Sequence, residues 1–184
     1  MSFKFNNHYK LKGLHAAFSP SQPSWHNYTI EKALEVYRNK QAAELGTRYH
    51  AWAAEAISLG LKQSKTKKTL NMYINDAIGY RMEPEVPLYY SDKFFGTADA
   101  ICFRNGLLRI HDLKTGKGAV DIRQLISYAA LFCLEYKIKP GTIEMELRIY
   151  QNDEVVCHVP EVDEIVRVMD QIVRLDEALG KEEV

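Results

Sequence analysis

The sequence has only three cysteines, no apolar run long enough for a membrane span, and no net charge. Cys102, Cys133 and Cys157 are far apart and form no CxxC pair, which argues against a zinc ribbon and a disulfide framework. We predict three reduced, mostly buried thiols. A membrane helix needs about 20 consecutive apolar residues, and residues 1–7 lack the apolar centre of a signal peptide. We therefore expect a cytoplasmic protein with no membrane partner.

Basic and acidic residues balance at 24 each, which does not favour a nucleic-acid protein, because phosphate binding usually leaves a basic footprint. The balance does not exclude a local footprint, and basic residues gather over 62–68 and 104–123. The alternative is that these side chains are only solvated. The candidate nucleic-acid-binding residues are Lys65, Lys67, Lys68, Lys117 and Arg123.

Of the 184 residues, 46% are hydrophobic and 26% are charged, which suits one domain with a real core. We predict a single domain over 1–184, because no long linker or internal repeat interrupts the chain. Its parts are an N-terminal helical part over 29–79, a sheet with a helix over 82–160, and a C-terminal helix over 161–180.

Helical signals dominate the N-terminal part. Thr29 is a candidate cap for a first helix. A longer helix is expected over 40–60, where apolar residues recur at helical spacing and Gly60 fits the stop. A third helix is expected over 66–79. Residues 18–25 should be irregular because of their two prolines.

Alternating apolar residues then predict strands over 82–90, 94–104 and 107–114, with Asn105-Gly106 as a two-residue hairpin turn. This order predicts an α/β fold with a mixed central sheet flanked by helices. The apolar stripe of the last helix either packs internally, which we favour, or pairs with another subunit. The later elements are a helix over 121–136, strands over 142–150 and 154–159 around an Asn152-Asp153 turn, and a helix over 162–179.

Three polar residues converge on the predicted hairpin. Asp112 and Lys114 are two apart on one strand and therefore point to the same face, while Leu113 points into a core. Asp99 lies on the preceding strand, where antiparallel pairing can bring it beside Asp112. The alternative is a surface salt-bridged pair of Asp112 and Lys114.

Two adjacent carboxylates repel each other unless a divalent cation neutralises them. Oxygen ligands with an incomplete shell suit Mg²⁺ or Mn²⁺, so we expect one or two such ions. A metal generates the attacking hydroxide and polarises a phosphate, and a lysine can orient the water or stabilise the developing charge. Phosphodiester hydrolysis needs these parts.

The pattern Gly96-Thr97-Ala98-Asp99, then Asp112-Leu113-Lys114-Thr115-Gly116-Lys117, then Gln124-x-x-x-Tyr128 resembles the PD-(D/E)XK nuclease superfamily. Within it, the pattern looks like the RecB-like exonuclease branch of bacterial recombination nucleases, CRISPR-adaptation exonucleases and phage nucleases. The resemblance covers roughly residues 44–150. It implies a restriction-endonuclease-like core (αβββαβ), here with an N-terminal helical extension and a C-terminal helix.

The resemblance also implies roles. Asp99, Asp112 and the Leu113 carbonyl match metal ligands, and Lys114 matches the catalytic lysine. His50 matches a helical histidine that the branch often adds to the metal, and Glu85 matches an acid near the site. The alternatives are a partly buried His50 without a ligand role and a simple exposed Glu85.

Gln124 and Tyr128 are four apart on a predicted helix and so share one face. They match a substrate-orienting or supporting motif that we count with the catalytic residues; the alternative is plain packing. Many relatives hold an iron–sulfur cluster with four cysteines, which three dispersed cysteines cannot supply, so we predict no cluster. No helicase domain is present, so a DNA-unwinding or recombination partner would be a separate chain.

We therefore expect a metal-dependent DNA nuclease, an exonuclease acting on DNA ends or single strands in recombination, repair or phage DNA metabolism. Its setting would be a bacterial or phage-infected host cell. The alternatives are a structure-specific or restriction-type endonuclease, and a non-catalytic nucleic-acid-binding module of the same fold. The sequence contains no phosphate-binding loop, nucleophile motif or cofactor fingerprint that would support a small-molecule enzyme.

Overall fold

The computed structural model describes residues 6–11, 13–116 and 118–182. The chain divides into two compact units, Met1–Leu45 and Gly46–Val184. A single domain over 1–184 stays a prediction. Among the described residues, no helix combines the length and the apolar character that a membrane span requires.

The first unit contains two short 3-10 helices, η1 (Tyr9–Leu11) and η2 (Pro23–Asn27), and the beginning of helix α1 (Ile30–Ser58). Thr29 caps α1 as predicted, because its Oγ1 accepts a hydrogen bond from the Lys32 backbone N–H at 3.2 Å. The prediction of two separate helices here was wrong. No proline or glycine lies between Thr29 and Gly46 to interrupt the hydrogen bonding, and one helix runs through.

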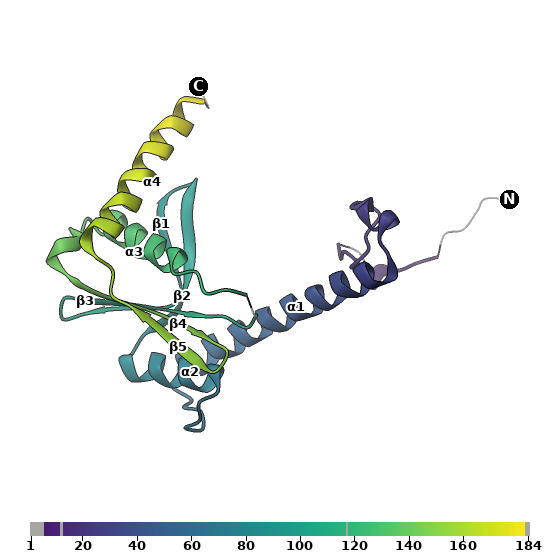
Figure 1. Cartoon of the computed structure of the whole chain (residues 1–184), viewed down its shortest axis with the longest axis horizontal. Coiled ribbons are helices and arrows are strands. Elements are labelled where there is room, and N and C mark those ends of the chain that lie inside the picture. Colours follow the sequence, from purple (N-terminus) through teal and green to yellow (C-terminus); the bar gives the residue numbers. More distant parts are fainter. Residues whose placement is uncertain (1–5, 12, 117, 183–184) are drawn as a thin grey trace. The chain divides into compact units, whose positions relative to one another are not determined.

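The second unit is built on a five-stranded sheet in the order β1-β2-β3-β4-β5 (Figure 1). Only β3 and β4 are parallel, and helix α3 (Arg123–Glu135) connects them. The predicted mixed α/β fold is confirmed. The strands are β1 (Glu83–Ser91), β2 (Phe94–Arg104), β3 (Leu107–Leu113), β4 (Glu144–Gln151) and β5 (Glu154–His158).

Helices cover both faces of this sheet (Figure 1). On one face, α3 buries Leu125 and Ala129 against strand residues such as Ile110, and α4 (Val162–Glu182) packs on α3 through Ile165 and Ile172. The last helix thus packs at least partly inside the chain, as favoured. The short 3-10 helix η3 (Pro140–Thr142) precedes β4.

On the other face, helix α2 (Thr69–Tyr80) packs with the C-terminal part of α1. Ala53, Tyr73 and Ile74 from these helices form a second core with Leu113 of β3 and Tyr150 of β4. Gly60 follows α1 with a φ of +66°, a left-handed conformation that favours glycine, and so confirms the predicted stop.

A buried polar layer also lies on this second face. His111 is fully buried, and its Nδ1 lies 3.3 Å from the Tyr150 hydroxyl. That hydroxyl donates to Asp76 at 2.7 Å, and Asp76 also pairs with Arg148 at 3.3 Å. Burial, together with the positive charges of Arg148 and Arg109, lowers the pKa of His111 to about 3. His111 is therefore a neutral core residue.

The cysteines follow the prediction in part. Cys102 and Cys133 are buried, whereas Cys157 is exposed. Cys157 lies on β5, an edge strand whose residues 154–157 are exposed.

Candidate active site

The two aspartates of the sequence pattern lie opposite each other on the β2–β3 hairpin. The ladder between these strands runs to the pair Ala100 and His111, so Asp99 and Asp112 occupy the next opposed positions. Asp99 is also held by the facing strand, because its Oδ2 accepts a hydrogen bond from the Leu113 backbone N–H at 2.8 Å. The Asn105-Gly106 turn, with φ of +52° and +77°, fixes this register.

Lys114 lies on the same side of β3 as Asp112. Its Nζ donates to Asp112 Oδ1 at 3.0 Å and to Gln124 Oε1 at 2.7 Å. The first turn of α3 positions Gln124. Gln124 of the sequence motif thus contacts the ammonium group of Lys114.

Asp112 is the most buried acid of the group, with a side chain only 3% exposed. Its Oδ2 is buried without a hydrogen-bond partner among the described residues. Burial raises the pKa of Asp112, the negative charge of Asp99 raises it further, and the bond from Lys114 opposes both. An ionised carboxylate in this position is costly unless a cation comes to the open oxygen.

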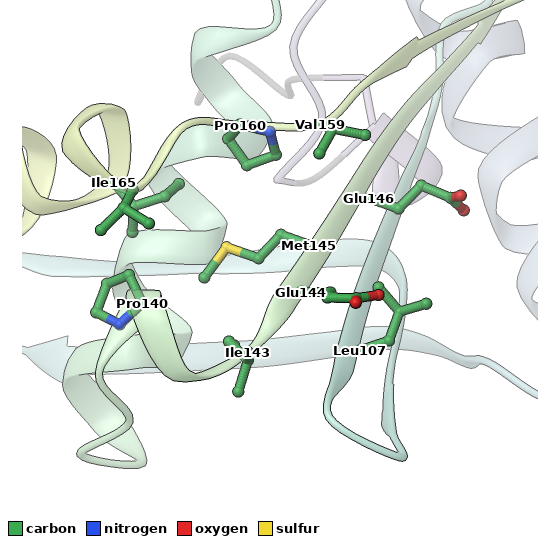
Figure 2. A pocket seen from close by; sticks show the side chains of 10 residues that line it. Leu107, Pro140, Ile143, Glu144, Met145, Glu146, Val159, Pro160 and Ile165 are labelled. Carbon is green, nitrogen blue, oxygen red and sulfur yellow. The ribbon is translucent and has the colours of Figure 1, made fainter.

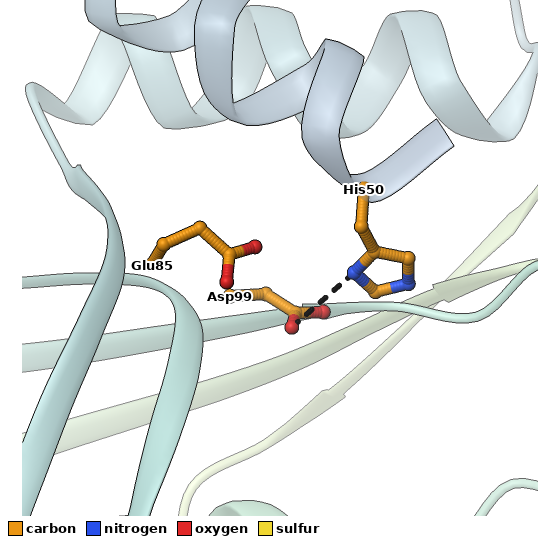
Figure 3. A group of neighbouring side chains, drawn as sticks. All are labelled: His50, Glu85 and Asp99. Atoms are coloured by element: carbon orange, nitrogen blue, oxygen red, sulfur yellow. Dashed lines mark ion pairs between the residues drawn. The ribbon is translucent and has the colours of Figure 1, made fainter. Parts of the chain in front are cut away.

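His50, Glu85 and Asp99 form a second part of the site (Figure 3). One ligand atom of each lies within 4.8 Å of the others, and His50 Nδ1 is 3.4 Å from Asp99 Oδ1. The hydrogen bond to Asp99 raises the pKa of His50, and burial opposes it. Burial and the charge of Asp99 raise the pKa of Glu85, while His50 lowers it. Three elements, α1, β1 and β2, therefore bring these groups together.

Glu85 reaches this group through an unusual backbone. Its φ of +53° is in the left-handed region, in the middle of strand β1. The ladder pairs Pro84 with Ala100 and Val86 with Ala98, and skips Glu85 itself. Such a conformation costs a non-glycine residue on the order of 1 kcal/mol and is often found at functional sites.

Tyr128, one turn after Gln124, packs against the strand that carries Asp99. A Cβ atom on Gly96 would lie 2.9 Å from Tyr128 Cε1, so only glycine leaves room for the ring. Tyr128 also packs against the core between the sheet and α3. The side chain of Leu113 is buried on the opposite face, as predicted, and only its backbone serves the site.

The candidate nucleic-acid-binding residues are spread more widely. Lys65 and Lys67 line a hollow formed by the loop that joins α1 to α2 and by α2 itself. Lys68 pairs with Asp153 at 2.7 Å, and Arg123 pairs with Asp121 at 2.6 Å. Lys117 lies outside the described residues.

Two hollows differ in their relation to the acids. One adjoins the site and has Tyr49, Lys68 and Lys114 on its wall. The other lies at the far end of β3, around Leu107, Met145 and Ile165, and none of the described candidate residues lines it (Figure 2). The chemistry of the candidate site is therefore confined to the end of the hairpin near Lys114.

A family model described as "Protein of unknown function (DUF2800)" matches residues 81–179. No curated protein and no solved structure matches the chain. The matched span contains Glu85, Asp99, Asp112 and Lys114, whereas His50 precedes it.

Proposed function

Because the chain belongs to the DUF2800 family, whose description gives no activity, we propose from the chemistry of its site that it is a divalent-metal-dependent nuclease. It hydrolyses phosphodiester bonds in DNA, and its relation to the PD-(D/E)XK superfamily is part of the proposal. The carrying observation is the opposed pair Asp99 and Asp112, with an open buried oxygen on one acid and Lys114 bound to it.

The donor set fits a divalent cation. Two carboxylates and one imidazole, from Glu85, Asp99 and His50, place one ligand atom each within 4.8 Å of the others. Asp112 lies on the strand beside Asp99 and is not part of that group, but its open oxygen needs a positive partner. The residues that would hold Mg²⁺ or Mn²⁺ are His50, Glu85, Asp99, Asp112 and the backbone carbonyl of Leu113. Such an ion supplies Lewis acidity and lowers the pKa of a bound water.

The chain's own residues define the rest of the chemistry. Lys114 is fixed between Asp112 and Gln124, so its ammonium group stays beside the acids, where it can orient a water and stabilise charge developing on a phosphate. The bond from Leu113 to Asp99 keeps that carboxylate aimed at His50. A site held in this way needs little rearrangement during the reaction.

We extend the proposal to an exonuclease that acts on DNA ends or single strands in the cytoplasm of a bacterial or phage-infected cell. Recombination, repair or phage DNA metabolism would be its setting, with any helicase on a separate chain. A digest of closed circular against linear DNA separates this from the endonuclease alternative. Rapid cutting of closed circles would exclude a strict exonuclease.

The direct test is digestion of end-labelled DNA with Mg²⁺ or Mn²⁺ by wild-type protein and by Asp112→Asn and Lys114→Met. Exposed residues of the same types supply matched controls, Asp170→Asn and Lys139→Met. We expect hydrolysis by the wild type and both controls, and its loss in both site variants. Hydrolysis that continues unchanged in both site variants would place the activity elsewhere. A folded wild type that cuts no DNA with either metal would favour the non-catalytic module.

A further inference from the structure

The β1–β2 hairpin has one closed face and one open face. Leu88, Tyr90 and Phe94 point into the core under α3, and the Ser91 hydroxyl donates to Asp176 of α4 at 2.6 Å. Pro87 and Tyr89 of β1 and Phe95 and Thr97 of β2 alternate with these residues, point the other way and are exposed. These four side chains form an open face on the outer half of the hairpin, and no other described element of the unit Gly46–Val184 covers it.

This open face carries the acids at one end and two aromatic rings at the other. The register pairs Pro87 with Thr97 and Tyr89 with Phe95, and the next opposed pair along the same face is Glu85 and Asp99. Phe95 is 66% exposed and Tyr89 is 50% exposed. Phe95 is four residues from Asp99 along β2, roughly 13 Å away in an extended strand.

Tyr89 is held in place although it is exposed. Its hydroxyl donates to Asp92 Oδ1 at 2.9 Å, and its backbone N–H donates to the Glu135 carboxylate at 2.9 Å. Large exposed rings contribute nothing to the core, and a ring fixed by a hydrogen bond loses little entropy when another ring stacks on it. Lys93 adds a positive charge at the tip of the hairpin.

We propose, resting on the proposed nuclease function, that the open face of this hairpin binds a single nucleic-acid strand, with bases stacked on Phe95 and Tyr89. The scissile phosphate then lies at the acids. Aromatic side chains stack on any base whose face is free, and in a duplex the neighbouring base pairs cover these faces. The face thus selects unpaired DNA, including the frayed end of a duplex.

Binding measured without turnover tests this inference separately from hydrolysis. The probe is a short single-stranded oligodeoxynucleotide that carries the fluorescent base 2-aminopurine, with Ca²⁺ in place of Mg²⁺ or Mn²⁺. We compare Phe95→Leu and Tyr89→Leu with Phe95→Tyr, which keeps a ring. Tyr136→Leu is the control, because Tyr136 is equally exposed at 53% but lies at the end of α3.

We expect each leucine variant at the hairpin to bind the single strand about tenfold more weakly and to lose the fluorescence change of a stacked base. Phe95→Tyr and Tyr136→Leu should bind like the wild type, and duplex binding should change little in all four. Single-strand binding by both leucine variants within about twofold of wild type would overturn the inference, even if the protein cuts DNA. Loss of base stacking in the leucine variants would support the inference even if the wild-type protein hydrolyses no DNA. An absence of hydrolysis would count against the nuclease proposal alone.

Discussion

The backbone N–H of Leu113 donates a hydrogen bond to Oδ2 of Asp99 at 2.8 Å, so the main chain of one strand fixes the carboxylate of its neighbour. The other oxygen, Oδ1, is left facing His50 at 3.4 Å. Because a backbone group holds it, the aim of Asp99 depends on the pairing of β2 with β3 rather than on any one side chain. Formation of the β2–β3 hairpin therefore also orients the carboxylate of Asp99.

The buried charge at Asp112 should cost stability in the absence of metal. We predict that Asp112→Asn raises the free energy of unfolding by about 1 kcal/mol in a chelator, because a neutral amide replaces a carboxylate with an unpartnered oxygen and can still accept the bond from Lys114. The same variant should lose the stabilisation that Mn²⁺ gives the wild type. Urea unfolding with chelator and with Mn²⁺ measures both effects.

The exposed Asp170→Asn is the control and should change neither value. An Asp112→Asn variant that is less stable than wild type in chelator would contradict the argument from buried charge.

Close packing between Gly96 and Tyr128 should make Gly96→Ala destabilising by about 1–3 kcal/mol. The added methyl would lie 2.9 Å from the Tyr128 ring, which is packed and has little room to move. Thermal or urea unfolding measures the loss. Removal of the ring in Gly96→Ala/Tyr128→Leu should recover part of it, as a double-mutant cycle would show.

Gly79→Ala is the matched control, since a Cβ there meets nothing within 4 Å. In the last turn of α2, Gly79→Ala should leave stability unchanged or raise it by up to about 1 kcal/mol. Additive changes in the free energy of unfolding for Gly96→Ala and Tyr128→Leu would show that the two positions do not interact sterically.

The buried His111 should make the fold sensitive to mild acid. The folded protein keeps His111 neutral down to a pKa of about 3, whereas the unfolded chain takes up the proton near 6.5. The contribution of neutral His111 to the free energy of unfolding is therefore complete above about pH 6.5. As the pH drops from 6.5 toward 3, this contribution falls by up to about 1.4 kcal/mol per pH unit. Between pH 6.5 and 5, wild type should lose about 2 kcal/mol more than His111→Phe.

Urea unfolding in chelator across this pH range tests the point. Parallel stability curves for the two proteins would show that His111 does not cause the acid sensitivity.

Salt dependence should identify which lysines contact phosphate. Removal of one phosphate contact lowers the slope of log affinity against log salt by about 0.7 for a single strand, and we expect this for Lys65→Ala and Lys67→Ala. Lys68→Ala should change the slope less, because Asp153 already pairs with that lysine. Asp153→Asn should free the lysine and steepen the slope. Equal slopes for all four variants and the wild type would remove these lysines from the binding surface.

The hairpin could be predicted because its information is local. Asn105 and Gly106 specify a two-residue turn, that turn fixes the register, and the register places Asp99 opposite Asp112. The approach of Gln124 to Lys114 is similarly local, ten residues along the chain.

Contacts between distant segments could not be predicted in the same way. The sequence predicts that Lys68 either contacts phosphate or is solvated, whereas Asp153, 85 residues away, binds it in the structure. The layer of Asp76, His111 and Tyr150 exists only once α2 docks on the sheet. The single continuous α1 shows that helix boundaries need a positive stop signal, which the region near residue 40 lacks.

The left-handed backbone of Glu85 sets the stability of the protein against the integrity of its candidate active site. Glycine adopts a φ of +53° without strain, so a search for heat resistance alone would favour replacing Glu85. Every variant selected in this way would lack Glu85, the acid beside His50 and Asp99. A screen that measures only thermal stability would therefore select variants with a damaged candidate active site, because it does not measure activity.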